Sequence, residues 1–118
     1  MMHDSPKRAV RCVRLATEDA PALSSLESRC FALPWTEQAF AEAFAGKTFH
    51  AFGIRETASP LSPRELAGYI AVYHTPDEVE ILNIAVREDR RRHGYGRLLM
   101  ATALQDAKET GILQGVLE

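Results

Sequence analysis

The feature that most constrains the fold of this chain is a pair of closely spaced glycines, Gly94 and Gly96, at the junction of two different hydrophobic patterns. Before them, residues 79–86 form a run of β-branched and aliphatic side chains that predicts a strand. After them, apolar residues recur at helical spacing, namely Leu99, Met100, Ala103 and Ala107. A strand that turns through glycines into a helix presents unpaired backbone N–H groups and the positive end of the helix dipole, which together suit an anion such as a pyrophosphate.

The remaining patterns predict a single α/β domain over residues 1–118. Helices are expected to begin at Thr17, at Thr36 and after the glycine pair, and to end before Pro34, at Gly46 and at Gly111. Further strands are expected at residues 9–15, 48–54, 66–73 and 112–117. A chain of this length buries about two thirds of its unfolded surface, which is enough for one core and not for two.

Composition argues against several classes of function. Fourteen Lys and Arg against sixteen Asp and Glu give a net charge of −2 and a pI near 6.1, so no overall positive field attracts nucleic acid. No apolar run approaches the roughly 18 to 20 residues of a membrane span, and the N-terminus lacks the apolar segment of a signal peptide, so we expect a cytoplasmic protein without a membrane partner. Cys12 and Cys30 form no CxxC pair and no cluster with histidines, so neither a disulfide scaffold nor a metal site is expected.

The glycine segment, residues 91–97, matches neither of the two common nucleotide-binding glycine motifs. It lacks the third glycine of the dinucleotide fingerprint and the Gly-Lys-Ser/Thr of a P-loop. A short Gly-x-Gly also has a plainer interpretation, in which the glycines only shape a tight turn and the neighbouring arginines are solvated. From the residues alone both interpretations stay open.

The segment resembles the acyl-CoA loop of the GNAT acetyltransferases, Gln/Arg-x-x-Gly-x-Gly/Ala, with Arg91, Gly94 and Gly96 in the three defining places. The preceding Leu82-Asn83-Ile84-Ala85-Val86 and the following Arg97-Leu98-Leu99 are similar to the fourth strand and third helix of that superfamily. The resemblance covers nearly the whole chain. It implies the GNAT fold, an α/β domain with a mixed, mostly antiparallel sheet and flanking helices, ending here after the fifth strand.

Within the superfamily the chain most resembles the ribosomal-protein-alanine N-acetyltransferases of the RimI type. Glu27, Arg29 and the segment Phe31-Ala-Leu-Pro34-Trp35-Thr36 are similar to the N-terminal part of those proteins. In those proteins, the segment that corresponds to the one around Trp35 borders the peptide cleft. The alternative interpretation of Trp35 is a hydrophobic staple that anchors the second helix.

The resemblance implies acetyl-CoA as cosubstrate, no metal, and direct transfer of the acetyl group to the N-terminal α-amine of a protein, an alanine of a small-subunit ribosomal protein. It assigns Glu118, which follows Leu117, as the general base. The positions that would contact acetyl-CoA are Ile84, Ala85, Val86, Arg92, His93, Gly94, Tyr95, Gly96 and Arg97. Because an α-amine has a pKa of about 7.7 to 8, roughly a tenth of it is neutral at pH 7, and a modest carboxylate base acting through water suffices.

The chain departs from the family at its C-terminal end. The family continues past the fifth strand through a helix and two strands, which bring an Asn that contacts CoA and a Tyr that acts as the acid, and the sequence ends at Glu118 before these. We therefore expect an exposed fifth strand that favours self-association or pairing with a completing segment.

Three other functions compete with this one. A degenerate, non-catalytic CoA-binding or interaction domain would keep the glycine loop without the acid. A GNAT enzyme acting on a small-molecule amine would share the cofactor site. A nucleic-acid-binding module would use Arg87, Arg90, Arg91, Arg92 and Arg97, but Glu88, Asp89 and the net negative charge argue against it.

Overall fold

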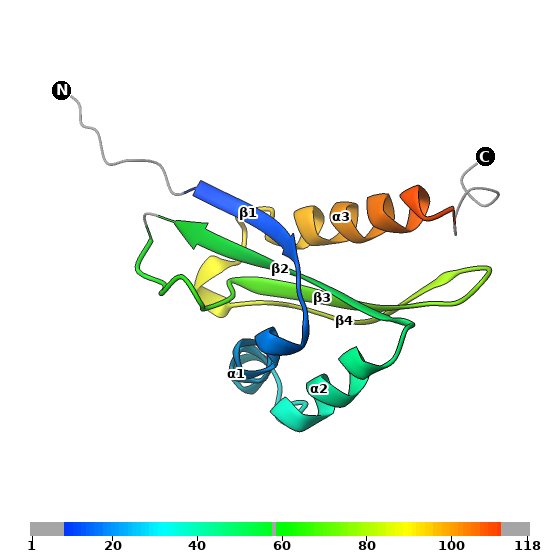
Figure 1. Cartoon of the computed structure of the whole chain (residues 1–118). Coiled ribbons are helices and arrows are strands. Elements are labelled where there is room, and N and C mark those ends of the chain that lie inside the picture. The colour runs from blue at the N-terminus through cyan, green and yellow to red at the C-terminus, as the bar shows by residue number, and fades with distance from the viewer. Residues whose placement is uncertain (1–8, 58, 112–118) are drawn as a thin grey trace.

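The computed structural model describes residues 9–57 and 59–111. These residues form one antiparallel sheet in the order β1-β2-β3-β4 (Figure 1). The strands are β1 (Ala9–Arg14), β2 (Phe49–Thr57), β3 (Gly68–His74) and β4 (Val79–Val86). The expected α/β fold with an antiparallel sheet is confirmed, whereas the fifth strand predicted at residues 112–117 lies outside the described residues.

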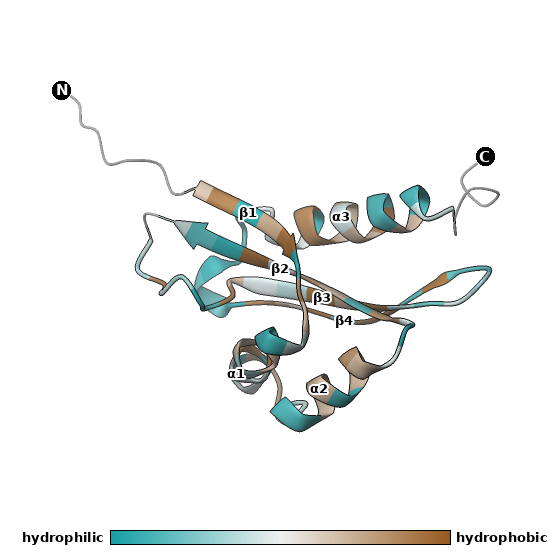
Figure 2. Ribbon diagram, viewed as in Figure 1, coloured by the Kyte–Doolittle hydropathy of each residue, from teal (hydrophilic) through white to brown (hydrophobic). Residues whose placement is uncertain are grey.

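The helices cover both faces of this sheet. Figure 1 shows α1 (Ala20–Cys30) and α2 (Glu37–Ala45) on one face and α3 (Tyr95–Glu109) on the other. The first face buries a cluster that includes Leu23, Phe40 and Tyr69, and the second buries one that includes Ile70 and Leu99. Figure 2 shows both hydrophobic and hydrophilic residues along α3, as expected for a helix with one face in the core.

Most element boundaries follow from local signals. Thr36 caps α2, since its hydroxyl accepts the Ala39 N–H at 3.0 Å, and α2 ends at Gly46 as predicted. The start of the first helix differs from the prediction, because a 3₁₀ turn, η1 (Thr17–Asp19), precedes α1. In this turn Asp19 accepts the backbone N–H of Ala16 at 2.8 Å, and Pro21 then occupies the first turn of α1, where its missing N–H costs nothing.

A β-bulge interrupts the pairing of β4 with β3. Ala71 pairs with Asn83 but the next residue, Val72, pairs with Ile81, so Leu82 is the additional residue in β4. A bulge increases the local twist and bends the strand, and residues 83–86 continue to pair with β3 beyond it. Because β4 is the last strand in the described sheet, this irregular segment lies at its edge.

Candidate functional site

The glycine turn follows β4 through a short 3₁₀ turn, η2 (Glu88–Arg90). Gly94 is the N-cap of α3 with φ of 79°, in the left-handed region that glycine adopts without strain. A Cβ atom built on Gly94 or on Gly96 would meet nothing within 4 Å, so open space lies over both positions. The backbone of the turn is therefore accessible to a ligand.

The start of α3 directs backbone N–H donors toward that space. The first hydrogen bond into the helix runs from the Leu98 N–H to the Gly94 carbonyl, at 3.1 Å. The N–H groups of Gly96 and Arg97 precede this bond and have no acceptor within the helix, and Gly94 has no side chain to cap them. The predicted strand, glycine turn and helix are thus present in the order and geometry of an anion site.

The charged side chains of the turn divide into two groups. Those of Arg92, His93 and Arg97 are exposed beside the glycines, and the His93 ring contacts the Arg91 carbonyl at 3.0 Å. Arg91 is also exposed, and its guanidinium donates to the Val86 carbonyl at 3.3 Å. This group can neutralise a bound phosphate.

The other two arginines of the predicted basic patch, Arg87 and Arg90, are buried in ion pairs. Arg87 donates to both carboxylate oxygens of Asp89, each at 2.9 Å, and Arg90 donates to Glu56 at 2.8 Å. The hydrogen bonds from Arg87, opposed by burial, hold the pKa of Asp89 at about 2. The exposed basic surface is therefore smaller than the sequence suggests.

Tyr95 is turned away from the glycine surface. Its side chain is buried, and its hydroxyl donates to Glu56 Oε2 at 2.5 Å. Among the positions predicted to contact the cofactor, Tyr95 therefore offers its backbone only.

The three strand positions predicted to contact the cofactor lie in β4 after the bulge. Ile84 and Val86 pack against the cluster beneath α3, and Ala85 packs into the cluster beneath α1 and α2. Their side chains belong to the two cores, so only the backbone of these three residues is left to meet a ligand at this strand.

Glu56 is a buried acid that the sequence analysis did not single out. Its carboxylate, at the end of β2, accepts hydrogen bonds from Arg90, from Tyr95 and from Ser59, the last at 2.6 Å. Burial opposes ionisation of Glu56, but these three hydrogen bonds and the charge of Arg90 outweigh it and lower its pKa to about 2. The pairing could not be read from local sequence because Arg90 lies 34 positions away.

Glu27 of α1 is a second buried acid, and it holds together three segments. It accepts the Trp35 N–H at 2.9 Å, the Asn83 amide at 2.8 Å and the Tyr69 hydroxyl. Burial, together with the hydrogen bond to Glu27, raises the pKa of Tyr69. The network fastens the segment between α1 and α2 to β4 at the bulge.

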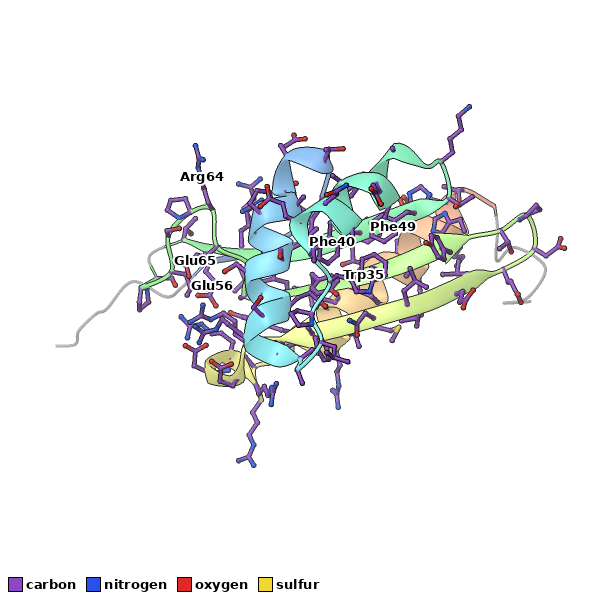
Figure 3. The ribbon with its side chains drawn as sticks, turned by 90° about the horizontal axis from the view of Figure 1, so that it is seen from below. Trp35, Phe40, Phe49, Glu56, Arg64 and Glu65 are labelled. Carbon is purple, nitrogen blue, oxygen red and sulfur yellow. The ribbon has the colours of Figure 1, made fainter. Side chains whose placement is uncertain are left out.

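Trp35 is fixed by its own ring contacts as well. Its ring lies 5.2 Å from that of Phe40 and 6.3 Å from that of Phe49, with 38% of its surface exposed. Figure 3 shows these three aromatic residues on one side of α1, and Glu56, Arg64 and Glu65 on the other. Trp35 thus anchors α2, as a hydrophobic staple would, and presents part of its ring to solvent.

A cavity of about 590 Å³ lies beside α1 and opens toward the segment that precedes β3. Leu26, Arg29, Arg64 and Leu66 are among the residues that line it. None of the residues predicted to contact the cofactor lines this cavity. Its position therefore differs from that of the glycine turn.

Glu118, the predicted general base, lies outside the described residues. Within the described residues, no group of three or more His, Cys, Asp or Glu could hold a metal ion. None of the helices in this part of the chain has the length and apolarity needed to cross a membrane.

Comparison with known proteins gives the family of the chain. The sequence profile of the acetyltransferase (GNAT) family matches residues 20–118. The chain belongs to the GNAT family. Its curated relatives include the ribosomal protein bS18-alanine N-acetyltransferases of Salmonella typhimurium, 30% identical over 104 residues, and of Escherichia coli, 30% identical over 98 residues.

Solved GNAT structures share the fold. The crystal structure of the corresponding Escherichia coli enzyme superposes with a TM-score of 0.73 at 28% identity, over 88% of this chain and 63% of that one. A Thermoplasma acidophilum PaiA N-acetyltransferase in complex with coenzyme A superposes with a TM-score of 0.72 at 13% identity, over 88% of this chain and 75% of that one, which shows the fold alone. The matches to the Salmonella and Escherichia coli relatives span 88% and 83% of this chain but only 66% and 62% of the relatives.

Proposed function

We propose that this GNAT chain is an acetyl-CoA-dependent N-acetyltransferase that acts on the N-terminal α-amine of a protein, an alanine of a small-subunit ribosomal protein. The observation that carries the proposal is the exposed glycine turn at the start of α3, which follows β4, the last strand of the described sheet. The acceptor is inferred from relatives named for that activity. The cytoplasmic setting expected from the sequence is part of the same proposal.

The residues of the turn fit a pyrophosphate. The N–H groups of Gly96 and Arg97 would donate to its oxygens, and the side chains of Arg92 and Arg97 would neutralise its charge. The backbone of residues 84–86 would hold the pantetheine arm along β4 and polarise the thioester carbonyl with a strand N–H. Glu118 would accept the proton of the amine through water.

Acetyl-CoA supplies the acetyl group as a thioester: a C–N bond forms to the acceptor amine, the C–S bond breaks, CoA leaves as the thiolate and the amine proton passes to the base. The chain needs neither an acyl-enzyme nor a metal for this transfer. An α-amine suits it better than a lysine side chain, whose pKa of about 10.4 leaves far less of the neutral amine at pH 7.

Calorimetric titration of acetyl-CoA into the purified chain tests the cofactor site. Gly96→Glu should abolish binding, because its carboxylate would occupy the place of the phosphates and repel them. Gly96→Ala is the matched control, since a Cβ fits at this helical position and the family pattern accepts alanine there. Absence of binding by the folded wild-type chain, or equal binding by the Gly96→Glu variant, would refute the proposed site.

Mass spectrometry of an alanine-starting peptide tests the acceptor. We expect acetylation of the free α-amine, none of the same peptide with a formylated N-terminus, and loss of activity in Glu118→Gln. Binding of acetyl-CoA without acetylation of the peptide or of small amines would favour the non-catalytic CoA-binding domain. Acetylation of small amines alone would favour the small-molecule enzyme.

A further inference from the structure

We propose that Glu56 is a positioning residue for the cofactor-binding turn, fastening both ends of that turn to β2. The inference rests on the proposed function, because it concerns how the same site is kept in shape. Its basis is the position of two hydrogen-bonded partners of Glu56, Arg90 and Tyr95, in the sequence and the fold.

The two partners flank the glycine turn. Arg90 is the last residue of η2, before the turn, and Tyr95 is the first residue of α3, after it. Arg90 Nε lies 3.1 Å and 2.8 Å from the two carboxylate oxygens of Glu56, and the Tyr95 hydroxyl lies 2.5 Å from Oε2. One carboxylate therefore binds the side chains on both sides of residues 91–94.

The backbone of the turn adopts an unfavourable conformation, which hydrogen bonds to the rest of the fold can hold in place. Arg92 has φ of 68° and Gly94 has φ of 79°, and a left-handed conformation is unfavourable for a residue with a side chain such as Arg92. The contacts described above within the turn, from Arg91 to Val86 and from His93 to Arg91, are local and exposed. The bonds to Glu56 are buried and join the turn to a strand 34 and 39 positions earlier.

The charges of the cluster also suit a neighbouring phosphate site. The Glu56 carboxylate is neutralised by Arg90, so it does not repel an anion at the turn. Arg90 in turn is held by Glu56 and cannot reach out to the ligand, which leaves Arg92 and Arg97 to contact it. Glu56 therefore acts through the backbone of the turn and touches no reacting atom.

Tyr95→Phe is the decisive variant because it removes one hydroxyl and keeps the buried ring. We expect its Kd for CoA to rise about tenfold by calorimetry, and its KM for acetyl-CoA to rise equally with kcat and the peptide KM unchanged. The rate with S-acetylpantetheine, which lacks the pyrophosphate, should stay at the wild-type value. A general loss of structure would lower the rates with both acetyl donors.

Ser59→Ala is the matched control, because Ser59 donates to the same carboxylate at 2.6 Å but lies outside the turn. We expect it to keep the wild-type Kd for CoA, whereas Glu56→Gln should weaken binding as Tyr95→Phe does. The inference is overturned if Tyr95→Phe keeps the wild-type Kd, if it lowers kcat alone, or if Ser59→Ala weakens binding equally. A folded wild-type chain that fails to bind CoA would instead overturn the proposed function, and the inference with it.

Discussion

At the scale of single residues, Glu27 shows how much one buried acid can contribute to the site. The residue is only 1% exposed, and its carboxyl group accepts three donors from different segments, among them the Trp35 N–H and the Asn83 amide. In Glu27→Gln the new NH₂ group must face one of these donors, so we expect a loss of about 1 to 3 kcal/mol in the free energy of unfolding. Urea denaturation followed by the fluorescence of Trp35, the single tryptophan, measures it directly.

Glu42→Gln is the matched control for this substitution. Glu42 lies exposed on α2 and, within the part of the chain that the structure describes, accepts only the Gln38 side chain, at 3.0 Å. Exposed pairs of this kind contribute little, so we expect a change within about 0.5 kcal/mol. Equal stability losses in the two variants would mean that the buried hydrogen bonds of Glu27 add nothing beyond a general effect of removing one negative charge.

At the scale of elements, α2 depends on its N-cap. The helix has nine residues, too few to be stable in isolation, and Thr36 satisfies the otherwise unpaired Ala39 N–H at 3.0 Å. We expect Thr36→Ala to lower the free energy of unfolding by about 1 kcal/mol and Thr36→Ser to restore most of it, measured by urea denaturation. If Ser and Ala at this position gave the same stability, the hydroxyl would not be the stabilising group.

The elements also show which features a sequence can predict. Strand β4 was predicted with the bounds that the structure shows, and the caps of α2 at Thr36 and Gly46 were predicted because both signals are local. The bulge at Leu82 and the roles of Glu27 and Glu56 were missed, since each depends on partners in elements distant in the sequence. The glycine turn was found through its flanking patterns and the family resemblance together. The hydrogen bond from the Tyr95 hydroxyl to Glu56 had no signal in the sequence.

At the scale of the whole molecule, the sheet carries ionisable groups whose burial makes folding depend on pH. His50 and His74 stack at 4.0 Å, and His74 Nε2 lies 4.0 Å from Asp106 of α3. Burial lowers the pKa of both histidines, although the charge of Asp106 opposes this. On the same side of the sheet as α3, Glu56 has a pKa of about 2 in place of 4.5. All three groups favour the folded state when they are unprotonated.

The chain should therefore lose stability on acidification in two stages. Below pH 6.5, the ordinary pKa of histidine, the unfolded state binds protons that the folded histidines resist, so the free energy of unfolding falls. Between pH 4.5 and about 2 it falls again, because Glu56 is protonated in the unfolded chain before it is in the folded one. Urea midpoints measured from pH 7.5 to pH 3 check both stages.

We expect His74→Phe, which retains a ring against His50, to reduce the fall between pH 6.5 and pH 5, and Glu56→Gln to reduce only the fall below pH 4.5. A wild-type midpoint that stayed constant down to pH 5 would contradict the role of the histidine pair and leave that of Glu56 to be judged from the lower range.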